Sequence, residues 1–487
     1  MSTLSESSTN ETKQNVSMSN ENMEQHTLQE LTRETIEAMS PQIRKTDEDQ
    51  ENGLELFCYV KCSSSDTELM RQCRGIVFND KKIVMRAFPY TIEYTHEDSE
   101  AIEKYIQPEF AKCEFYDAHE GALIRMFNFN GKWYTSTHRK LNAFRSKWAS
   151  IKSFGDYFMD ALKAEVENNS ALRDSLPAEE ESKGEENSDT LLSRFQTILD
   201  TDKQYMFLVR HSAENRIVCD APERPTLYHV GTFVDGNLVM TEDIKVPYPR
   251  KLSFLSMDDL IDHVNKIDIR NLQGVIVFAP SNVQYKIFHS DYRALFDARG
   301  NEPSIKFRYL QVRMNPEQSE LLKQLYPEKI EVFEEYENIL YNVAKKIYHS
   351  YVQRHIKGNW STLPQEEYVV DKVCHMWHEE DRKNNRISLE KIIQVMNEQP
   401  PTNLNKMIRH YREDEIAREK GEEPKEIKIT PRSKKFPPTK SSKQTRTFKP
   451  RQTKPHQRLL KSNRFPPTVT KDVKKVSQTR TVEKTNS

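Results

Sequence analysis

The chain has 487 residues, with 73 Lys or Arg against 74 Asp or Glu and a formal net charge of -1. Its hydrophobic content of 36% and mean hydropathy of -0.83 are low for a chain that folds throughout. No apolar run approaches the roughly 18 residues that a membrane-spanning helix needs, and the first residues are too polar for a signal peptide. These features exclude membrane proteins, and we expect an intracellular, cytoplasmic protein with folded domains and unfolded segments.

Positive charge is concentrated near the C-terminus. Residues 425–487 hold 19 Lys or Arg against three acidic residues, a net charge of +16, so the rest of the chain carries -17. An imperfect repeat at 436–447 and 465–481 begins each time with Phe-Pro-Pro-Thr. Basic, Pro-rich segments without core-forming residues typically stay unfolded and bind polyanions. We therefore expect 413–487 to be a disordered tail that binds RNA, with recruitment of a protein partner or mere solubilisation as alternatives.

The first half of the chain is rich in predicted strands. Residues 1–50 are dominated by Ser, Asn, Glu, Thr and Gln and read as a disordered leader, in which 21–39 could form a short helix. Alternating and aromatic residues then predict strands at 54–62, 73–80, 81–90 and 113–118. A hairpin should close at Asn130-Gly131, because this pair favours a type I′ turn.

Helices and further strands follow. A helix is expected at 154–176, and 177–189 form an acidic surface loop. Further strands are predicted at 204–211, 215–220, 226–240 and 274–280, with a helix at 256–267. Strands with inserted helices indicate an α+β domain, which we place at 51–310. From 311 the apolar period becomes helical, which predicts an all-α domain at 311–412.

Six short stretches occur in the order and spacing of a known family. They are QCRGIVF (72–78), AFPYTIEY (87–94), AHEGAL (118–123), NRIV (215–218), QGVIVF (273–278) and YKIFHSDY (285–292). Over 54–310 the chain thereby resembles the RNA ligase family, especially the bacteriophage tRNA-repair RNA ligases. The resemblance implies a mixed-sheet nucleotidyltransferase (RNA ligase-like) fold, ATP and Mg²⁺ as cofactors, and RNA as partner. The helical region resembles that group only in architecture.

The resemblance also implies a site from which key groups are missing. In the family a lysine attacks ATP to give lysyl-AMP, and the AMP then moves to an RNA 5′-phosphate. The nucleophile's position holds Ala118, whose methyl group cannot form a phosphoramidate. Glu120 keeps the negative charge of the acid that lies near the nucleophile in the family. Gln273 stands where the fourth motif has a glutamate, and Lys286 and Phe288 stand where the fifth motif has two lysines. We expect a pseudoenzyme that binds RNA, with a nucleotide as a further candidate ligand.

Two other hypotheses remain open, so enzymatic activity is left undecided. The chain would be an active ATP-dependent RNA ligase if a displaced nucleophile served. His119 should point to the other face of its strand, and Lys112, Lys132 and Lys140 are the nearby amines. Alternatively, the chain is a non-enzymatic scaffold that recruits a partner through its tail. The motif spacing and low-complexity arms suit a protein of a large DNA virus.

Several residues are candidates for contact with RNA or a nucleotide. They are Arg74, Gly121, Arg125, Arg139, Lys140, Asn215, Arg216 and Lys286. For each charged side chain an ordinary ion pair within the fold is the alternative. In 135–148 basic residues are interleaved with His138, Phe144 and Trp148. This pattern is typical of RNA-binding grooves, in which basic side chains contact phosphates and aromatic rings stack on bases. A basic amphipathic helix would give the same pattern.

No metal site is expected. Cys58, Cys62 and Cys73 lack a matching second pair of ligands. Cys374 and His378 are a second pair of candidate zinc ligands, which would share one face of a helix. Two ligands do not hold zinc, so packing in the core is the better interpretation.

Overall fold

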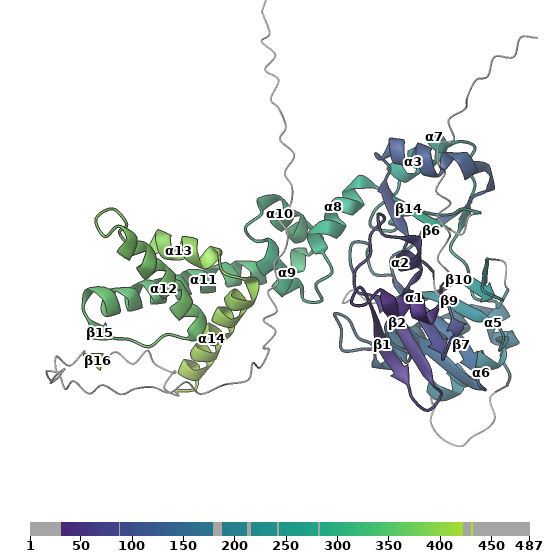
Figure 1. Cartoon of the computed structure of the whole chain (residues 1–487), viewed down its shortest axis with the longest axis horizontal. Helices are drawn as coiled ribbons and strands as arrows, with labels where there is room; N and C mark the ends of the chain where they lie inside the picture. The colour runs from purple at the N-terminus through teal and green to yellow at the C-terminus, as the bar shows by residue number, and fades with distance from the viewer. Residues whose placement is uncertain are drawn as a thin grey trace, which may run out of the picture. The chain divides into compact units, whose positions relative to one another are not determined.

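The computed structural model describes residues 31–86, 88–178, 188–211, 216–240, 243–280, 283–421 and 430–431 (Figure 1). Asn215, most of the acidic loop and both Phe-Pro-Pro-Thr repeats lie outside these residues. The described residues belong to one compact unit. Within the described ranges, none of the helices combines the length and apolar character needed to cross a membrane.

Three larger β-sheets are present among the described residues. The antiparallel four-stranded sheet has the order β1(Ile43–Asp49), β2(Leu54–Tyr59), β3(Arg74–Asn79), β4(Lys82–Met85). The antiparallel five-stranded sheet has the order β11(Asn237–Val239), β10(Thr226–Val234), β9(Gln204–Arg210), β7(Ala122–Phe129), β8(Lys132–Ser136). The mixed sheet has the order β12(Lys251–Leu252), β6(Glu114–Ala118), β13(Gly274–Phe278), β14(Gln284–Phe288), β5(Ile92–Thr95), in which β14 and β5 run parallel.

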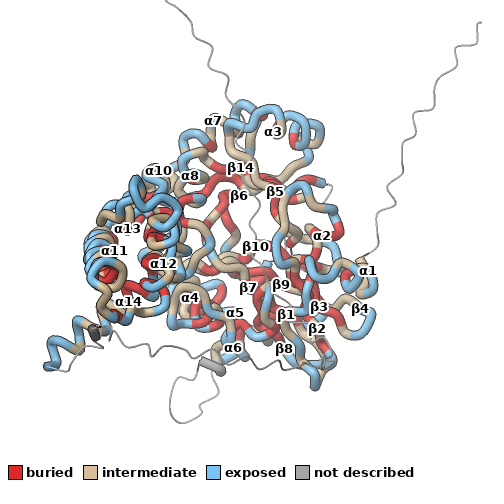
Figure 2. Tube along the Cα trace, turned by 60° about the vertical axis from the view of Figure 1, so that its left-hand side comes forward, coloured by how far each residue is buried: buried red, intermediate tan, exposed pale blue. Residues whose placement is uncertain are grey.

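Alternation along the strands distributes apolar side chains between separate cores. In β9, Phe207 and Val209 face α4(Phe154–Asn168), α5(Ser170–Ser175) and α6(Ser188–Thr197), whereas Met206 enters the core shared with the four-stranded sheet. In the mixed sheet, Val275 and Val277 face the core formed with α3(Ser99–Tyr105) and α7(Met257–Asn265). Figure 2 shows buried residues concentrated along the strands and exposed ones on the covering helices.

Helices dominate from β14 onward. They are α8(Ser290–Arg299), α9(Ile305–Val312), α10(Pro316–Leu325), α11(Ile330–Tyr351), α12(Gln365–Glu380), α13(Leu389–Asn397) and α14(Pro401–Glu419). In α11, Phe333, Tyr336, Leu340, Val343 and Ile347 are buried at spacings of three and four residues, so one face of the helix packs into the shared core. A π-helical turn at Val352–Ile356 and the short pair β15(Asn359–Trp360) and β16(Thr430–Pro431) complete the region.

The expected α+β organisation, with mixed sheets followed by helices, is confirmed. The hairpin at Asn130-Gly131 is also confirmed, since these residues adopt φ values of 52° and 77° and close β7 onto β8. Residues 154–176 form α4 and α5, and 256–267 contain α7.

Three expectations and one alternative need correction. The leader is not disordered up to residue 50, because α1(Arg33–Ala38) and β1 lie within it. The segment after Asn215 is not a strand, since 217–219 form bends. Residues 137–148 contain only a 3₁₀ turn at Ala143–Arg145 and no amphipathic helix. Helix formation begins at Ser290 instead of 311 and continues to Glu419, beyond the expected start of the tail.

Arg125 joins two sheets from the inside. It is fully buried on β7, and its guanidinium donates to the carbonyl of Gly75 on β3 and, at 2.6 Å, to the carbonyl of Thr137. Gly75 has φ of 89°, and a Cβ there would lie 2.6 Å from the His138 carbonyl oxygen. Only glycine therefore allows β3 and the segment after β8 to approach closely enough for this clamp.

We predict that Arg125→Met destabilises the fold by about 3 kcal/mol, because two buried carbonyl oxygens lose their donor. Urea unfolding followed by circular dichroism measures this. Arg44→Met, at an exposed arginine on β1, is the control and should cost under about 0.5 kcal/mol. An Arg125→Met variant of normal stability would show that the clamp does not hold the two sheets together.

Candidate functional site

The chain crosses between two sheets at the position of the expected nucleophile. β6 ends at Ala118 in the mixed sheet, and β7 begins at Ala122 in the five-stranded sheet. His119, Glu120 and Gly121 form the crossing and line a cavity of about 670 Å³. The cavity therefore lies between the inner faces of the two sheets.

Strand alternation determines which side chains face this cavity. Tyr116 on β6, Ile276 on β13 and Lys286 on β14 are neighbours in the hydrogen-bonded register and all line it. Ala118 is fully buried and, two residues after Tyr116, falls on the same side of β6. A longer side chain at position 118 would thus extend toward Lys286 and Gln273.

Glu120 is committed to the protein itself. Its carboxylate accepts hydrogen bonds from the backbone amides of Ile217 (2.5 Å), Val218 (2.9 Å) and Cys219 (2.9 Å), and from the Tyr292 hydroxyl (3.1 Å). Only 9% of the residue is exposed. Glu120 thus anchors the bends at 217–219, which explains why the predicted strand does not form there.

Gly121 is required by a close approach of two strands. A Cβ at this position would lie 2.6 Å from the carbonyl oxygen of Val209 and 3.1 Å from the Leu208 side chain. Its φ is not in the left-handed region, so its role is to save space and not to supply a special turn conformation.

The fourth and fifth motifs meet inside the cavity. The Lys286 ammonium donates to the Gln273 side-chain oxygen at 3.0 Å and lies 3.9 Å from a carboxylate oxygen of Glu93. Burial lowers the pKa of Lys286, and the Glu93 carboxylate opposes that effect. The Lys286 ammonium also lies 5.1 Å from the centre of the Phe288 ring, at the other fifth-motif position. The Lys286 ammonium therefore donates to a neutral amide oxygen.

His119 lines the cavity, contrary to the expectation that it would point away. Its ring stacks on Tyr228 with centroids 4.6 Å apart and an angle of 10°. Burial, assisted by the positive charge of Arg210, lowers the pKa of His119 to about 4, so the imidazole is neutral at pH 7. Its Nδ1 is buried without a hydrogen-bond partner among the described residues.

Guanidinium groups give the cavity its charge. Arg74, Arg139 and Arg210 all line it. Arg210 donates to the Asp220 backbone carbonyl at 3.1 Å, and none of the three forms an ion pair with a carboxylate in the described part of the chain. Trp148 also lines the cavity, and Arg299 lies 5.1 Å from the centre of its ring. Three positive charges without matching carboxylates make this cavity suited to anions.

Other candidate residues are engaged elsewhere. Arg125 does not line the cavity, because it is buried in the clamp described above. Lys140 pairs with Asp47 at 3.4 Å. Arg216 reaches the cavity, but its guanidinium is paired with Asp220 at 2.9 Å and donates to the Leu325 carbonyl. The expected ion-pair alternative thus describes Lys140 and Arg216.

The donors present do not fit a resident Mg²⁺ ion. Glu120 is saturated by amides, and Asp117 forms two hydrogen bonds, of 2.9 and 3.2 Å, with Arg250. The remaining motif position is the neutral Gln273, which is a weaker ligand for a hard cation than a carboxylate. Within the described ranges, no group of three or more His, Cys, Asp or Glu could hold a metal ion.

Of the residues considered as zinc ligands on α12, Cys374 packs in the helical core, whereas His378 is half-buried. Cys374 is fully buried on α12, and the His378 ring bonds the Asn385 carbonyl at 2.6 Å. His375 stacks on His355 with centroids 3.8 Å apart.

The sequence interpretation missed Arg210, Tyr228 and Asp117. Arg210 is the last residue of β9. Phe207 and Val209 face the helices, so strand alternation places Leu208 and Arg210 on the opposite side, toward the cavity. Tyr228 and Asp117 belong to no quoted motif, and their proximity depends on how the two sheets face each other.

We predict that Glu120→Gln destabilises the chain by about 3 kcal/mol, because an amide offers one acceptor oxygen to the four donors that now meet a charged carboxylate. The urea unfolding midpoint measures this, and Glu97→Gln, at an exposed glutamate outside the cavity, is the control. Equal midpoints for the two variants would contradict the anchoring role.

Comparisons with known proteins identify relatives. Over 376 residues the chain is 31% identical to an "Immediate-early protein ICP-46 homolog" of Invertebrate iridescent virus 3, covering 74% of this chain and 77% of that protein. Over 402 residues it is 26% identical to the homolog of Invertebrate iridescent virus 6, covering 77% and 85%. No family model matches the chain.

The resemblance to RNA ligases is confirmed by a more distant relative. The chain is 23% identical over 246 residues to the "Putative bifunctional polynucleotide kinase/RNA ligase" of Autographa californica nuclear polyhedrosis virus, covering 46% of this chain and 30% of that protein. Among solved structures it is similar to an archaeal ATP-dependent RNA ligase, with 11% identity, a TM-score of 0.35, and coverage of 61% of this chain and 70% of that one. With 31% identity over three quarters of its length, the chain belongs to the family of ICP-46 immediate-early proteins.

Proposed function

We propose that the cavity between β6 and β7 binds the phosphates of a nucleotide or of an RNA end, without forming a lysyl-adenylate. The observation that carries the proposal is that Arg74, Arg139 and Arg210 line one cavity without ion pairs to described carboxylates. Guanidinium groups bind phosphate oxygens through paired hydrogen bonds, and partial exclusion of water strengthens these contacts. The distant relative named as a polynucleotide kinase/RNA ligase supports RNA as the ligand class.

The loss of lysyl-adenylate chemistry is supported by three positions. Ala118 offers no nucleophile at the end of β6. Glu120 is occupied by three backbone amides and a tyrosine, so it is not available to a ribose or a metal. Gln273 accepts from Lys286 without bringing negative charge into the cavity. Together these changes leave groups that bind anions and remove groups that would activate a reaction.

A second candidate function is covalent catalysis through His119. Its ring lines the cavity and is neutral at pH 7, the protonation state in which imidazole is a nucleophile. In that reaction a ring nitrogen would bond the α-phosphorus of ATP while the bond to pyrophosphate breaks. The labelling experiment below distinguishes this possibility, because a phosphorus–imidazole adduct would be found on the peptide that contains His119.

We predict that Arg74→Gln lowers affinity for ATP and for a 5′-phosphorylated RNA oligonucleotide about ten-fold, because one phosphate loses a charged donor. Arg44→Gln removes the same charge from an exposed residue outside the cavity and should change affinity less than two-fold at 0.15 M salt. Fluorescence anisotropy and isothermal titration calorimetry measure both. Absence of ATP and RNA binding by the wild-type chain would refute the proposal.

We predict that the wild-type chain and Ala118→Lys both form no denaturation-stable adduct with α-labelled ATP or GTP in Mg²⁺ or Mn²⁺. The single variant still lacks an acid at position 273 to balance Lys286 and the introduced amine. In Ala118→Lys/Gln273→Glu this acid returns, and labelling should exceed that of the single variant. Phe288→Lys is not included, because Phe288 is 2% exposed and stacks on Tyr292, so a charge there would disturb the core.

Denaturing electrophoresis measures the covalent label on each variant, and peptide mass spectrometry then locates the labelled residue. Strong labelling of Ala118→Lys alone would show that the other losses matter less than proposed. A label on wild-type protein at His119 would favour the second candidate function over the first.

A further inference from the structure

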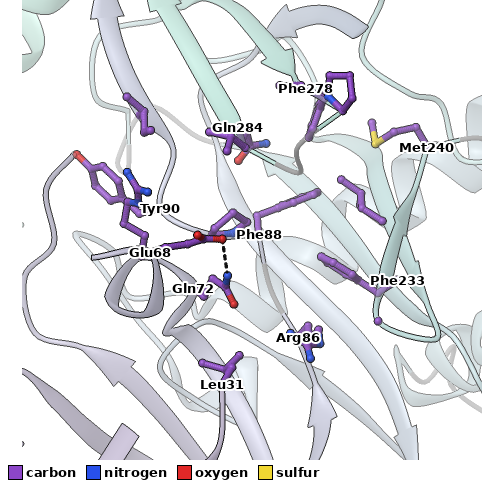
Figure 3. Close-up of a pocket in the computed structure, with 18 of the residues that line it drawn as sticks. Leu31, Glu68, Gln72, Arg86, Phe88, Tyr90, Phe233, Met240, Phe278 and Gln284 are labelled. Atoms are coloured by element: carbon purple, nitrogen blue, oxygen red, sulfur yellow. Dashed lines mark hydrogen bonds between the residues drawn. The ribbon is translucent and has the colours of Figure 1, made fainter. Parts of the chain in front are cut away.

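A second cavity adjoins the first. It has a volume of about 330 Å³ and lies beside β3, β5 and β13 (Figure 3). Phe88, Met240, Phe278 and Gln284 line both cavities, so one wall is common to them. A ligand that extends past this wall would reach from one cavity into the other.

Aromatic rings form much of the second cavity. The Phe88 ring lies 6.0 Å from both Phe233 and Phe278, at interplanar angles of 53° and 50°. In Figure 3 Phe233 and Phe278 lie on one side of the view, and Glu68 and Tyr90 lie on the other. A Cβ at Gly231 would lie 3.0 Å from the Phe88 ring, so glycine there leaves room for that ring. Such walls suit a flat aromatic ligand.

Polar groups at the second cavity can form hydrogen bonds with the edge of a flat aromatic ligand. Gln72 donates to one carboxylate oxygen of Glu68 at 3.0 Å, which leaves the second oxygen of this exposed side chain as an acceptor. The Gln284 side-chain oxygen accepts from Thr91 at 2.8 Å, which leaves its amide nitrogen as a donor. Donors and acceptors beside aromatic walls are the elements by which proteins recognise unpaired bases.

Positive charge accompanies the aromatic walls. Arg71 and Arg86 line the second cavity, and neither is ion-paired with a carboxylate among the residues described. Arg71 donates to the Ser64 carbonyl at 3.2 Å, whereas the Arg86 guanidinium has no hydrogen bond to the described protein. An apolar site for a small hydrophobic molecule would not need these charges, but a nucleic acid backbone does.

We propose that the second cavity holds an unpaired base of a single-stranded RNA whose neighbouring phosphate lies in the first cavity. The proposal rests on the proposed function and adds that RNA is the preferred ligand and that it binds as an extended strand. The volume of 330 Å³ is near the lower end of the range for small-molecule pockets, roughly 300–1,000 Å³, and suits one nucleotide unit.

The test compares two probes on the same full-length protein. The first is a fluorescent, 5′-phosphorylated, single-stranded oligouridylate, and the second is ATP, which is long enough only for the first cavity. Arg86 and Phe233 line the second cavity and not the first. Arg86→Gln and Phe233→Leu should each weaken oligouridylate binding roughly ten-fold, because one phosphate contact or one stacking surface is lost. Both variants should leave ATP affinity within about two-fold of wild type, whereas Arg74→Gln weakens both probes. Arg44→Gln is again the matched control.

A crosslinking measurement still tests the proposal if Phe233→Leu folds poorly. Oligouridylate that carries 5-iodouridine is irradiated on the wild-type protein, and the crosslinked peptide is identified by mass spectrometry. Crosslinks to residues that line only the second cavity, such as Tyr90, Phe233 or Leu238, would support the proposal. Crosslinks confined to residues elsewhere would overturn it, even with tight RNA binding.

The outcomes separate the two proposals. If wild-type protein binds both probes and Arg86→Gln changes neither, the second cavity is not a base site and the proposed function stands. If wild-type protein binds ATP but not the oligouridylate, the second cavity has another occupant, such as a partner's aromatic side chain, and this inference fails. If it binds neither probe, both proposals fail together.

Discussion

The arrangement of the whole cavity depends on the hydrogen bonds of Glu120. Its carboxylate connects the crossing between β6 and β7 to the backbone of Ile217, Val218 and Cys219, and to Tyr292 on α8. Charged hydrogen bonds of this kind are stronger than neutral ones, and breaking them would leave buried amides unpaired. Because Tyr292 also belongs to the core of the helical region, one side chain links the sheets to the helices.

This use of Glu120 changes the chemical character of the cavity. The Glu120 carboxylate faces backbone amides and not the open cavity. Gln273, which accepts the hydrogen bond of Lys286, carries no negative charge. Asp117 is neutralised by Arg250 at the cavity's edge. The guanidinium groups that remain are therefore not balanced by free carboxylates, and an incoming phosphate meets attraction without competing repulsion.

Local signals in the sequence predicted much of the fold. The Asn130-Gly131 turn, the helices around Phe158 and Leu260, and the general change from strands to helices follow from residue preference and apolar period. β1 was missed because IRKTDED is almost entirely polar and is held by pairing with β2, a contact that composition does not reveal. The segment after Asn215 has strand-like residues, but Glu120 takes three of its amides.

The site was harder to predict because its residues come from different elements. Ala118, Gln273 and Lys286 were found through their place in motifs, and the structure brings these three positions together. Whether a basic side chain is available was not visible in the sequence. Arg125 is buried, and Lys140 is paired with Asp47, which lies 93 residues earlier in the sequence. Such distant pairings depend on the packing of sheets, which no short sequence window contains.

The hydrogen bond between Lys286 and Gln273 links ligand affinity to proton concentration. A neutral amide does not hold a proton on the amine as a carboxylate would. Burial lowers the pKa of Lys286, and the Glu93 carboxylate at 3.9 Å opposes this only in part. A bound phosphate would favour the protonated amine and raise its pKa again, so binding and protonation strengthen each other. Anion affinity in this cavity should consequently weaken with rising pH sooner than it would beside a solvent-exposed lysine. A neutral amide beside this buried amine thus sets an upper pH limit on the proposed anion binding.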